Sequence, residues 1–283
     1  MAGKIQTFIL KDEVLKFNGV GGKKKIFVYT PKSFTYERAK SYPLIYCFDG
    51  QNIFETSKDF ICESKVSLSM EKICQTKGVE AIIVGIYNGE GESTRDRELT
   101  MSPNFGLIAN PFVGDTNKCG TLEKTGEFIK KTLISFMEEK FNAGSDRNKT
   151  ILSGASSGGL ASLYLGLCYP DIFGRLSVLS PATSLFGKTD WKRFLSGINK
   201  DNRQKIFIYC GKNCNDDLEN FLYDGGNDLL GAKDIKSLLN KYLPLADVKE
   251  VFIDGAIHNE SAWKTALFNS FDFLFDFDKR SEF

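Results

Sequence analysis

Ser156 is flanked by glycines. It stands between a short predicted strand at residues 150–153 and a stretch from Leu160 in which apolar residues recur at helical spacing. The segment Gly154-Ala155-Ser156-Ser157-Gly158 predicts a sharp turn from a strand into a helix. At the apex of such a turn a serine hydroxyl is exposed, and small neighbours are needed because larger side chains would collide with nearby backbone. Ser156 is therefore a candidate nucleophile. The amide of Ser157, at the start of the helix, is a candidate donor to an oxyanion. An ordinary glycine-rich turn is the alternative.

A serine nucleophile needs a neighbouring base, and the chain contains a single histidine, His258. It follows the last predicted strand, where the chain order serine, acid, histidine places a catalytic base. The acid is expected after the predicted strand at residues 205–210, where Asp216, Asp217 and Glu219 are all candidates. One buried carboxylate is enough to orient the imidazole and stabilise its charged form.

The second oxyanion donor is expected in the loop at residues 49–52, which follows an apolar strand at residues 43–48. The amide of Gln51, just past a glycine, is our choice. A plain turn from a strand into a helix would show the same residues.

The elements that must position these residues alternate along the chain. Continuous apolar runs predict strands buried on both faces, as in a parallel sheet covered by helices. Two β-like runs at residues 5–10 and 25–30 predict an antiparallel opening. The further strands are predicted at residues 43–48, 80–87, 150–153, 176–179, 205–210 and 248–253, and the helices at 64–76, 121–141, 191–196, 218–243 (interrupted at 225–226) and 261–275. The pattern predicts one α/β domain over residues 1–283, with a mainly parallel sheet of about eight strands flanked by helices.

Residues 88–120 are rich in Gly, Asn, Pro and charged residues and show no sustained period. An irregular segment of this length in a compact domain is usually functional, although a solvated loop without a role is the alternative. Trp263 lies five residues past His258. It could border the site, but packing of the last helix against the sheet is the simpler interpretation.

The composition excludes several classes of partner. The formal net charge is +1, with 37 basic and 36 acidic residues interspersed, so we expect neither a nucleic-acid nor a membrane partner. No stretch approaches the roughly 20 apolar residues of a transmembrane helix. Seven cysteines, an odd number, leave at least one thiol free. Cys210 and Cys214 have no accompanying pair or histidine cluster, so no zinc site is expected.

Four runs resemble a known family: YPLIYCFDGQNIF, TRDRELT, SDRNKTILSGASSGGLASLYLGLCYPDIFGRLSVLSP and GAIHNESAW. They look like the Putative esterase family of α/β-hydrolases, which includes esterase D, the enterochelin esterases and the feruloyl esterases of carbohydrate esterase family one. The resemblance implies the α/β-hydrolase fold, with Ser156 as nucleophile, His258 as base, and the amides of Gln51 and Ser157 as oxyanion donors. No metal or organic cofactor is implied.

The resemblance also bears on the acid. Many family members carry it at the position of Cys214, and a two-residue insertion brings Asp216 into the family pattern, so Asp216 is preferred. A cysteine in the acid's place could instead mean a weakened triad. If neither Asp216 nor Asp217 reaches the imidazole, a non-catalytic carbohydrate-binding relative is favoured.

Among family members the feruloyl esterases resemble this chain most. The implied substrate is ferulate or a related hydroxycinnamate esterified to plant cell-wall arabinoxylan, with a small molecule or an oligosaccharide as the ester partner. The alternatives are esters of siderophore trilactones or acetylated xylan. Feruloyl esterases of this family are usually secreted, so the resemblance implies secretion of this protein. A cytoplasmic location is the alternative.

Overall fold

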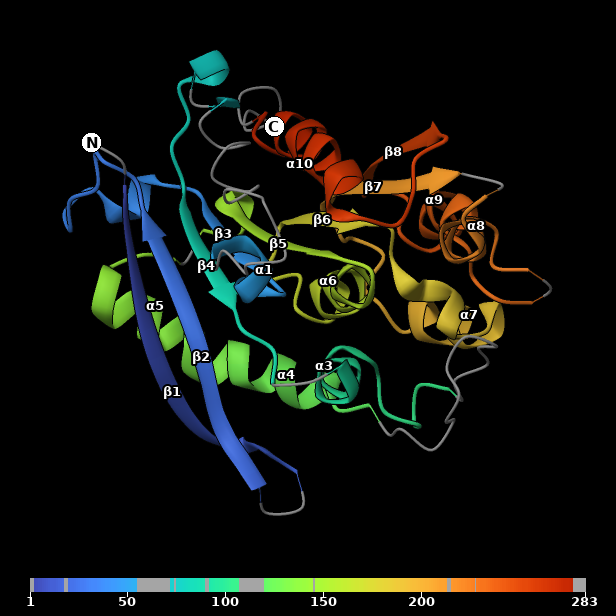
Figure 1. Cartoon of the computed structure of the whole chain (residues 1–283), viewed down its shortest axis with the longest axis horizontal. Coiled ribbons are helices and arrows are strands. Elements are labelled where there is room, and N and C mark those ends of the chain that lie inside the picture. The colour runs from blue at the N-terminus through green and yellow to red at the C-terminus, as the bar shows by residue number, and fades with distance from the viewer. Residues whose placement is uncertain are drawn as a thin grey trace.

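The computed structural model describes residues 3–17, 20–54, 72–73, 75–89, 92–106, 120–144, 146–212, 215–226 and 228–276. Within these residues the strands form one eight-stranded sheet with the order β1-β2-β4-β3-β5-β6-β7-β8 (Figure 1). The strands are β1 (Lys4–Phe17), β2 (Val20–Thr30), β3 (Leu44–Cys47), β4 (Ile82–Ile86), β5 (Thr150–Ala155), β6 (Arg175–Leu179), β7 (Lys205–Lys212) and β8 (Asp247–Asp254).

The sheet is antiparallel only at its N-terminal edge. β1 pairs with β2 and β2 with β4 in antiparallel register, whereas every pair from β4 through β3, β5, β6 and β7 to β8 is parallel. The antiparallel opening and the parallel continuation are both as predicted. The continuous apolar runs explain the parallel part, because Tyr46 faces one apolar cluster while its neighbour Cys47 faces the other, and both are buried.

Helices cover both faces of this sheet. α10, red in Figure 1, covers one face with Phe271 and Leu274, and most of the other helices lie on the opposite side. The α-helices are α1 (Gly50–Phe54), α3 (Glu92–Leu99), α4 (Leu122–Phe128), α5 (Ile134–Phe141), α6 (Ser157–Cys168), α7 (Lys188–Ser196), α8 (Asp217–Asp224), α9 (Ala232–Tyr242) and α10 (Glu260–Leu274). A π-helical segment, Ile129–Leu133, joins α4 to α5, and short 3-10 turns span Ala39–Ser41, Arg147–Lys149 and Ala182–Leu185. In the part of the chain that the structure describes, no helix is both long and apolar enough to span a lipid bilayer.

One predicted segment differs from the structure. The segment 88–120 is not irregular throughout, because α3 occupies part of it; residues 107–119 lie outside the described residues. The interruption predicted at 225–226 within the helix at 218–243 is confirmed. α8 and α9 are separate helices, and Gly225 and Gly226 after α8 both have positive φ. Most of the predicted helix at 64–76 also lies outside the described residues.

The parallel strands place several loops together at their carboxyl ends. Asp49 follows β3, Ser156 follows β5, Ser180 follows β6 and His258 lies four residues beyond β8. In open α/β sheets ligands bind at this edge. The topology thus brings the candidate residues, which are far apart in the sequence, to one rim of the sheet.

Candidate active site

Ser156 occupies the strained turn between β5 and α6. Its backbone has φ 58° and ψ −123°, a conformation that L-residues rarely adopt. Two backbone hydrogen bonds fix it there, from the Ser156 N–H to the Leu179 carbonyl (3.0 Å) and from the Ala182 N–H to the Ser156 carbonyl (3.1 Å). Strain of this kind persists only where the surroundings over-determine it, and it is found most often at functional sites.

The glycines around the turn are required by close backbone approach. A Cβ atom at Gly154 would lie 2.3 Å from the carbonyl oxygen of Gly158, the second residue of α6. No side chain fits in that space, so the strand and the helix can meet only through glycine.

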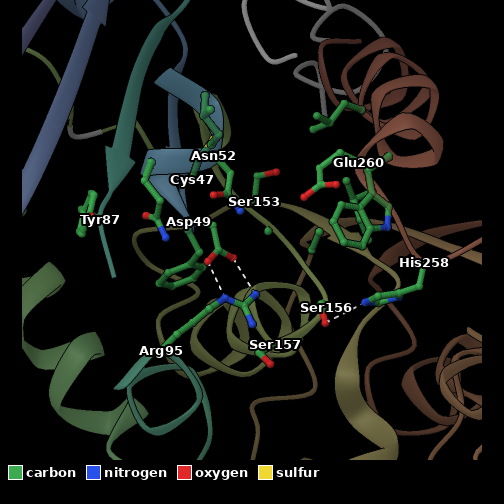
Figure 2. A pocket seen from close by; sticks show the side chains of 18 of the residues that line it. Cys47, Asp49, Asn52, Tyr87, Arg95, Ser153, Ser156, Ser157, His258 and Glu260 are labelled. Carbon is green, nitrogen blue, oxygen red and sulfur yellow. Dashed lines mark hydrogen bonds and ion pairs between the residues drawn. The ribbon is translucent and has the colours of Figure 1, made fainter. Parts of the chain in front are cut away.

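The imidazole of His258 reaches the Ser156 hydroxyl. Its Nε2 lies 3.1 Å from Ser156 Oγ, as the dashed line in Figure 2 shows, although the residues are 102 positions apart. This distance is within the reach expected of a nucleophile and its base. The structure thus brings together the two residues that the sequence pairs.

The carboxylate at the other side of the imidazole belongs to Glu219. Its Oε2 lies 2.6 Å from Nδ1 of His258, and its side chain is fully buried. Glu219 lies in the first turn of α8, which directs it inward. Since an ionised carboxylate only accepts hydrogen bonds, we assign the proton to Nδ1, which leaves Nε2 free to accept the serine proton.

Our preference for Asp216 is therefore corrected. Asp216 is the N-cap of α8: its Oδ1 accepts a hydrogen bond from the Glu219 backbone N–H at 2.9 Å, and its Oδ2 accepts one from the backbone N–H of His258 at 2.8 Å. Burial opposes ionisation of this carboxyl, but the two backbone N–H groups outweigh it and the pKa of Asp216 is lowered. Asp216 holds the backbones of both triad candidates and does not contact the ring.

The structure also shows where Asp217, the second acid candidate, lies. Asp217 is exposed to solvent on the outer side of α8. Cys214 lies outside the described residues. Neither Asp216 nor Asp217 bonds to the imidazole, but Glu219, the third candidate, does, so the imidazole has its carboxylate partner.

A pocket of about 740 Å³ opens beside the serine. Ser156 and His258 line it, and α10 contributes a wall through Glu260, Trp263 and Leu267, which lie on one helical face. Figure 2 shows the labelled residues from β3, β5 and α3 facing the same space. Trp263 does border the site, and its indole ring meets the His258 ring edge-on with centroids 5.0 Å apart.

Gln51 and Ser157 both line this pocket beside Ser156. Ser157 is the first residue of α6, and Gln51 is the second residue of α1. The side-chain oxygen of Gln51 accepts a hydrogen bond from the backbone N–H of Asn88 at 3.3 Å. The two residues that carry the candidate amides therefore line the same pocket as the serine.

An ion pair that our sequence analysis did not anticipate supports the loop carrying Gln51. Arg95 of α3 makes two parallel hydrogen bonds to Asp49, Nε to Oδ1 at 2.7 Å and a terminal nitrogen to Oδ2 at 2.9 Å (Figure 2). The Asn88 side-chain amide also donates to Asp49 Oδ1. Asp49 is buried and has φ 56°, so the pair fixes a strained residue two positions before Gln51. Gly89, Arg95 and Asp96 line the pocket, which gives part of the segment 88–120 a place in its wall.

Among the described residues Cys47, Cys168 and Cys210 are free thiols. Cys47 lines the pocket, but burial raises its pKa to about 12, so it stays protonated and is a poor nucleophile at neutral pH. No cluster of three or more His, Cys, Asp or Glu side chains that could hold a metal occurs in the described ranges.

The chain as a whole is similar to known proteins. The chain matches the family described as Putative esterase over residues 18–274. The protein belongs to this family. This esterase-family chain is similar to the ferri-bacillibactin esterase BesA of Bacillus subtilis (strain 168). The two are 28% identical over 190 residues, which is 64% of this chain. The matches to BesA and to a second Bacillus subtilis protein cover 62% and 57% of those proteins' own lengths.

Solved structures share the fold. A ferulic acid esterase superimposes with a TM-score of 0.63 at 18% identity, covering 97% of this chain and 98% of that one. The siderophore hydrolase EstB of Aspergillus nidulans superimposes with a TM-score of 0.64 at 19% identity, covering 95% and 94%. The chain therefore has the α/β-hydrolase fold that the resemblance implied.

Proposed function

We propose that this member of the esterase family hydrolyses carboxylic esters through an acyl-enzyme, with Ser156 as nucleophile, His258 as general base and acid, and Glu219 as the triad acid. The observation that carries the proposal is the continuous chain of contacts Ser156 Oγ to His258 Nε2 (3.1 Å) and His258 Nδ1 to Glu219 Oε2 (2.6 Å). Ser156 and His258 both line the pocket, and Ser156 occupies a strained turn.

In the first half of the reaction the Ser156 hydroxyl attacks the ester carbonyl while Nε2 of His258 takes its proton. The amides of Ser157 and Gln51 stabilise the oxyanion, and the positive end of the α6 dipole adds to this at Ser157. The buried Glu219 carboxylate stabilises the imidazolium. His258 then protonates the departing alcohol, leaving Ser156 acylated.

In the second half, water takes the place of the alcohol. His258 removes a proton from the water, the hydroxide attacks the acyl carbonyl at the same oxyanion donors, and the proton passes to Ser156 as the acid leaves. No step calls on a group other than these side chains, two amides and water.

We consider two substrate classes, each supported by a comparison. The first is an ester of ferulate or a related hydroxycinnamate on plant cell-wall arabinoxylan, supported by the fold shared with a ferulic acid esterase. The second is a siderophore ester, supported by the similarity to BesA and by the fold shared with EstB. The pocket's size, about 740 Å³, is within the range of small-molecule sites and admits either.

The deciding experiment measures initial hydrolysis rates on methyl ferulate, a feruloylated arabino-oligosaccharide, a siderophore trilactone and p-nitrophenyl acetate, with the Ser156→Ala variant as blank. Preference for the feruloyl esters supports the first class and preference for the trilactone the second. Hydrolysis of the acetate alone refutes both. A non-catalytic relative would leave all four substrates intact, which would overturn the proposed reaction itself.

A further inference from the structure

Ser180 is a buried residue that has no role in the reaction described so far. It directly follows β6, is completely buried and has φ 38°, a strained value for a residue other than glycine. Its backbone N–H bonds to the Tyr209 carbonyl of the neighbouring strand at 2.6 Å. The side chain is thereby held in one place, with its hydroxyl 2.8 Å from Oε1 of Glu219.

Trp263 determines which way that hydroxyl points. Its indole Nε1 lies 3.1 Å from Ser180 Oγ. An indole N–H can only donate, whereas a serine hydroxyl has one proton to give. Because Ser180 Oγ accepts from the indole N–H, its own proton is free to be donated to Glu219. Trp263 therefore donates to Ser180, and Ser180 donates to Glu219.

The same Glu219 oxygen receives further donors. The Gly211 N–H lies 2.5 Å from Oε1, and the Cys210 thiol lies 3.5 Å from it. Burial raises the pKa of the Cys210 thiol, which keeps its proton available for this contact. Oε1 is therefore fully occupied, and the other oxygen, Oε2, is the one turned to His258.

We propose that Ser180 and Trp263 are positioning residues of the catalytic acid, which lock the Glu219 carboxylate so that Oε2 meets Nδ1 of His258. The effect on kcat rests on the proposed function, whereas the orientation of the Glu219 carboxylate can be tested without a substrate. Trp263 acts at both ends of the acid–base pair, because its ring also packs edge-on against the imidazole, at an interplanar angle of 88°.

The chain's single histidine makes a direct test possible. With 15N-labelled histidine, NMR reports the tautomer and the Nδ1–H hydrogen bond of His258 without overlap. In the unmodified protein we expect a strongly deshielded Nδ1–H proton. In Ser180→Ala and Trp263→Phe this proton should move upfield and exchange faster with water, more in Ser180→Ala. An unchanged signal in both variants would overturn the proposal, whether or not a substrate has been found.

Kinetics provide the second readout. Loss of one hydrogen bond to a charged group predicts a kcat lower by about ten- to a hundredfold in Ser180→Ala, and by several-fold in Trp263→Phe, which keeps the ring but loses the N–H. The matched controls are Ser270→Ala, which removes a buried hydroxyl bonded to Ser177, and Trp191→Phe, which removes a buried indole N–H bonded to the Thr183 carbonyl. Both controls should keep kcat within about twofold, a change of at most about 0.4 kcal/mol in activation free energy.

A double-mutant cycle separates positioning from general structural damage. If Ser180 acts through Glu219, Ser180→Ala should cost little further activity in a Glu219→Gln background. Additive losses, or control variants as impaired as the test variants, would refute the proposal. If Ser180→Ala fails to fold, as far-UV circular dichroism would show, Trp263→Phe and its NMR spectrum decide the question alone.

Discussion

Oε2 of Glu219 lies 2.6 Å from Nδ1 of His258, although Asp216, three residues earlier, faces the same histidine. The two carboxylates contact different parts of His258. Glu219 meets the ring from a fully buried position, and Asp216 meets the backbone N–H of His258 from the cap of α8. A single helix start thus fixes both the ring and the main chain of the proposed base.

The contact between Glu219 and the imidazole predicts different outcomes for substitution of Glu219 and of Asp217, which lies two residues earlier on the same helix. Glu219→Gln should lower kcat on the order of ten-thousandfold, because a neutral amide cannot stabilise the imidazolium and favours the wrong tautomer. Asp217→Asn, on the exposed side of the same helix, should change kcat by less than about twofold. Steady-state kinetics on any ester that the protein turns over provide the comparison. Near-normal turnover by Glu219→Gln would remove Glu219 from the mechanism.

Asp216 should contribute a stability that depends on pH. Its pKa is lowered in the folded protein relative to its ordinary value of 3.8, so the folded state favours the ionised carboxyl. The contribution is present above about pH 4 and disappears as the pH falls through the lowered pKa. It should be below about 1 kcal/mol, because the side chain is partly exposed and water screens it. Urea unfolding should show that wild type is more stable than Asp216→Asn at pH 6 and that this difference shrinks as the pH falls below about 4. A difference that widens on acidification would contradict the assignment.

The ion pair between Arg95 and Asp49 should matter for both stability and activity. Arg95→Ala leaves the Asp49 carboxylate buried without its bidentate partner, and should lower the free energy of unfolding by about 1–3 kcal/mol, allowing for the partial exposure of Arg95. Turnover should also fall, since Asp49 fixes the loop that carries Gln51. Urea denaturation and kcat measure the two effects. Lys131→Ala, which removes a pair on an exposed helix face, is the control and should leave the unfolding midpoint unchanged. Equal behaviour of the two variants would refute this role of α3.

The close approach at Gly154 predicts a steric effect. Gly154→Ala places a methyl group 2.3 Å from the Gly158 carbonyl oxygen, so the strand and helix must separate at Ser156. We expect a loss of about 1–3 kcal/mol in stability and a large loss of activity. Gly197→Ala, where a Cβ atom would meet nothing closer than 3.5 Å, serves as the control and should be neutral. Thermal unfolding and initial rates measure both, and a fully active Gly154→Ala would contradict the described turn.

The parallel half of the sheet could be predicted because apolar residues run continuously through its inner strands. The strands β3, β5 and β6 each carry a residue for both faces at successive positions, as Tyr46 and Cys47 do, and that pattern survives in a single sequence. That the side chains of Ser156 and His258 meet could also be predicted, since Ser156 sits in a motif with a fixed backbone shape and His258 is the sole histidine.

Two features could not be predicted, for physical reasons. Whether Asp216 or Glu219 reaches the imidazole depends on where α8 begins, and three closely spaced acids fit several starts. α3 has only one apolar residue, Leu99, among its eight, so it has no hydrophobic periodicity. Long-range pairs support it instead, from Arg95 to Asp49 and from Glu98 to Lys24, which a local pattern does not reveal.

The most direct test of the account is covalent labelling with an active-site-directed fluorophosphonate, followed by peptide mass spectrometry. Only an activated serine beside its base reacts rapidly with such a reagent. We expect a single adduct on Ser156, formed at least a hundredfold more slowly in His258→Ala and absent in Ser156→Ala. An adduct on another residue, or labelling of Ser156 at the same rate without His258, would contradict it.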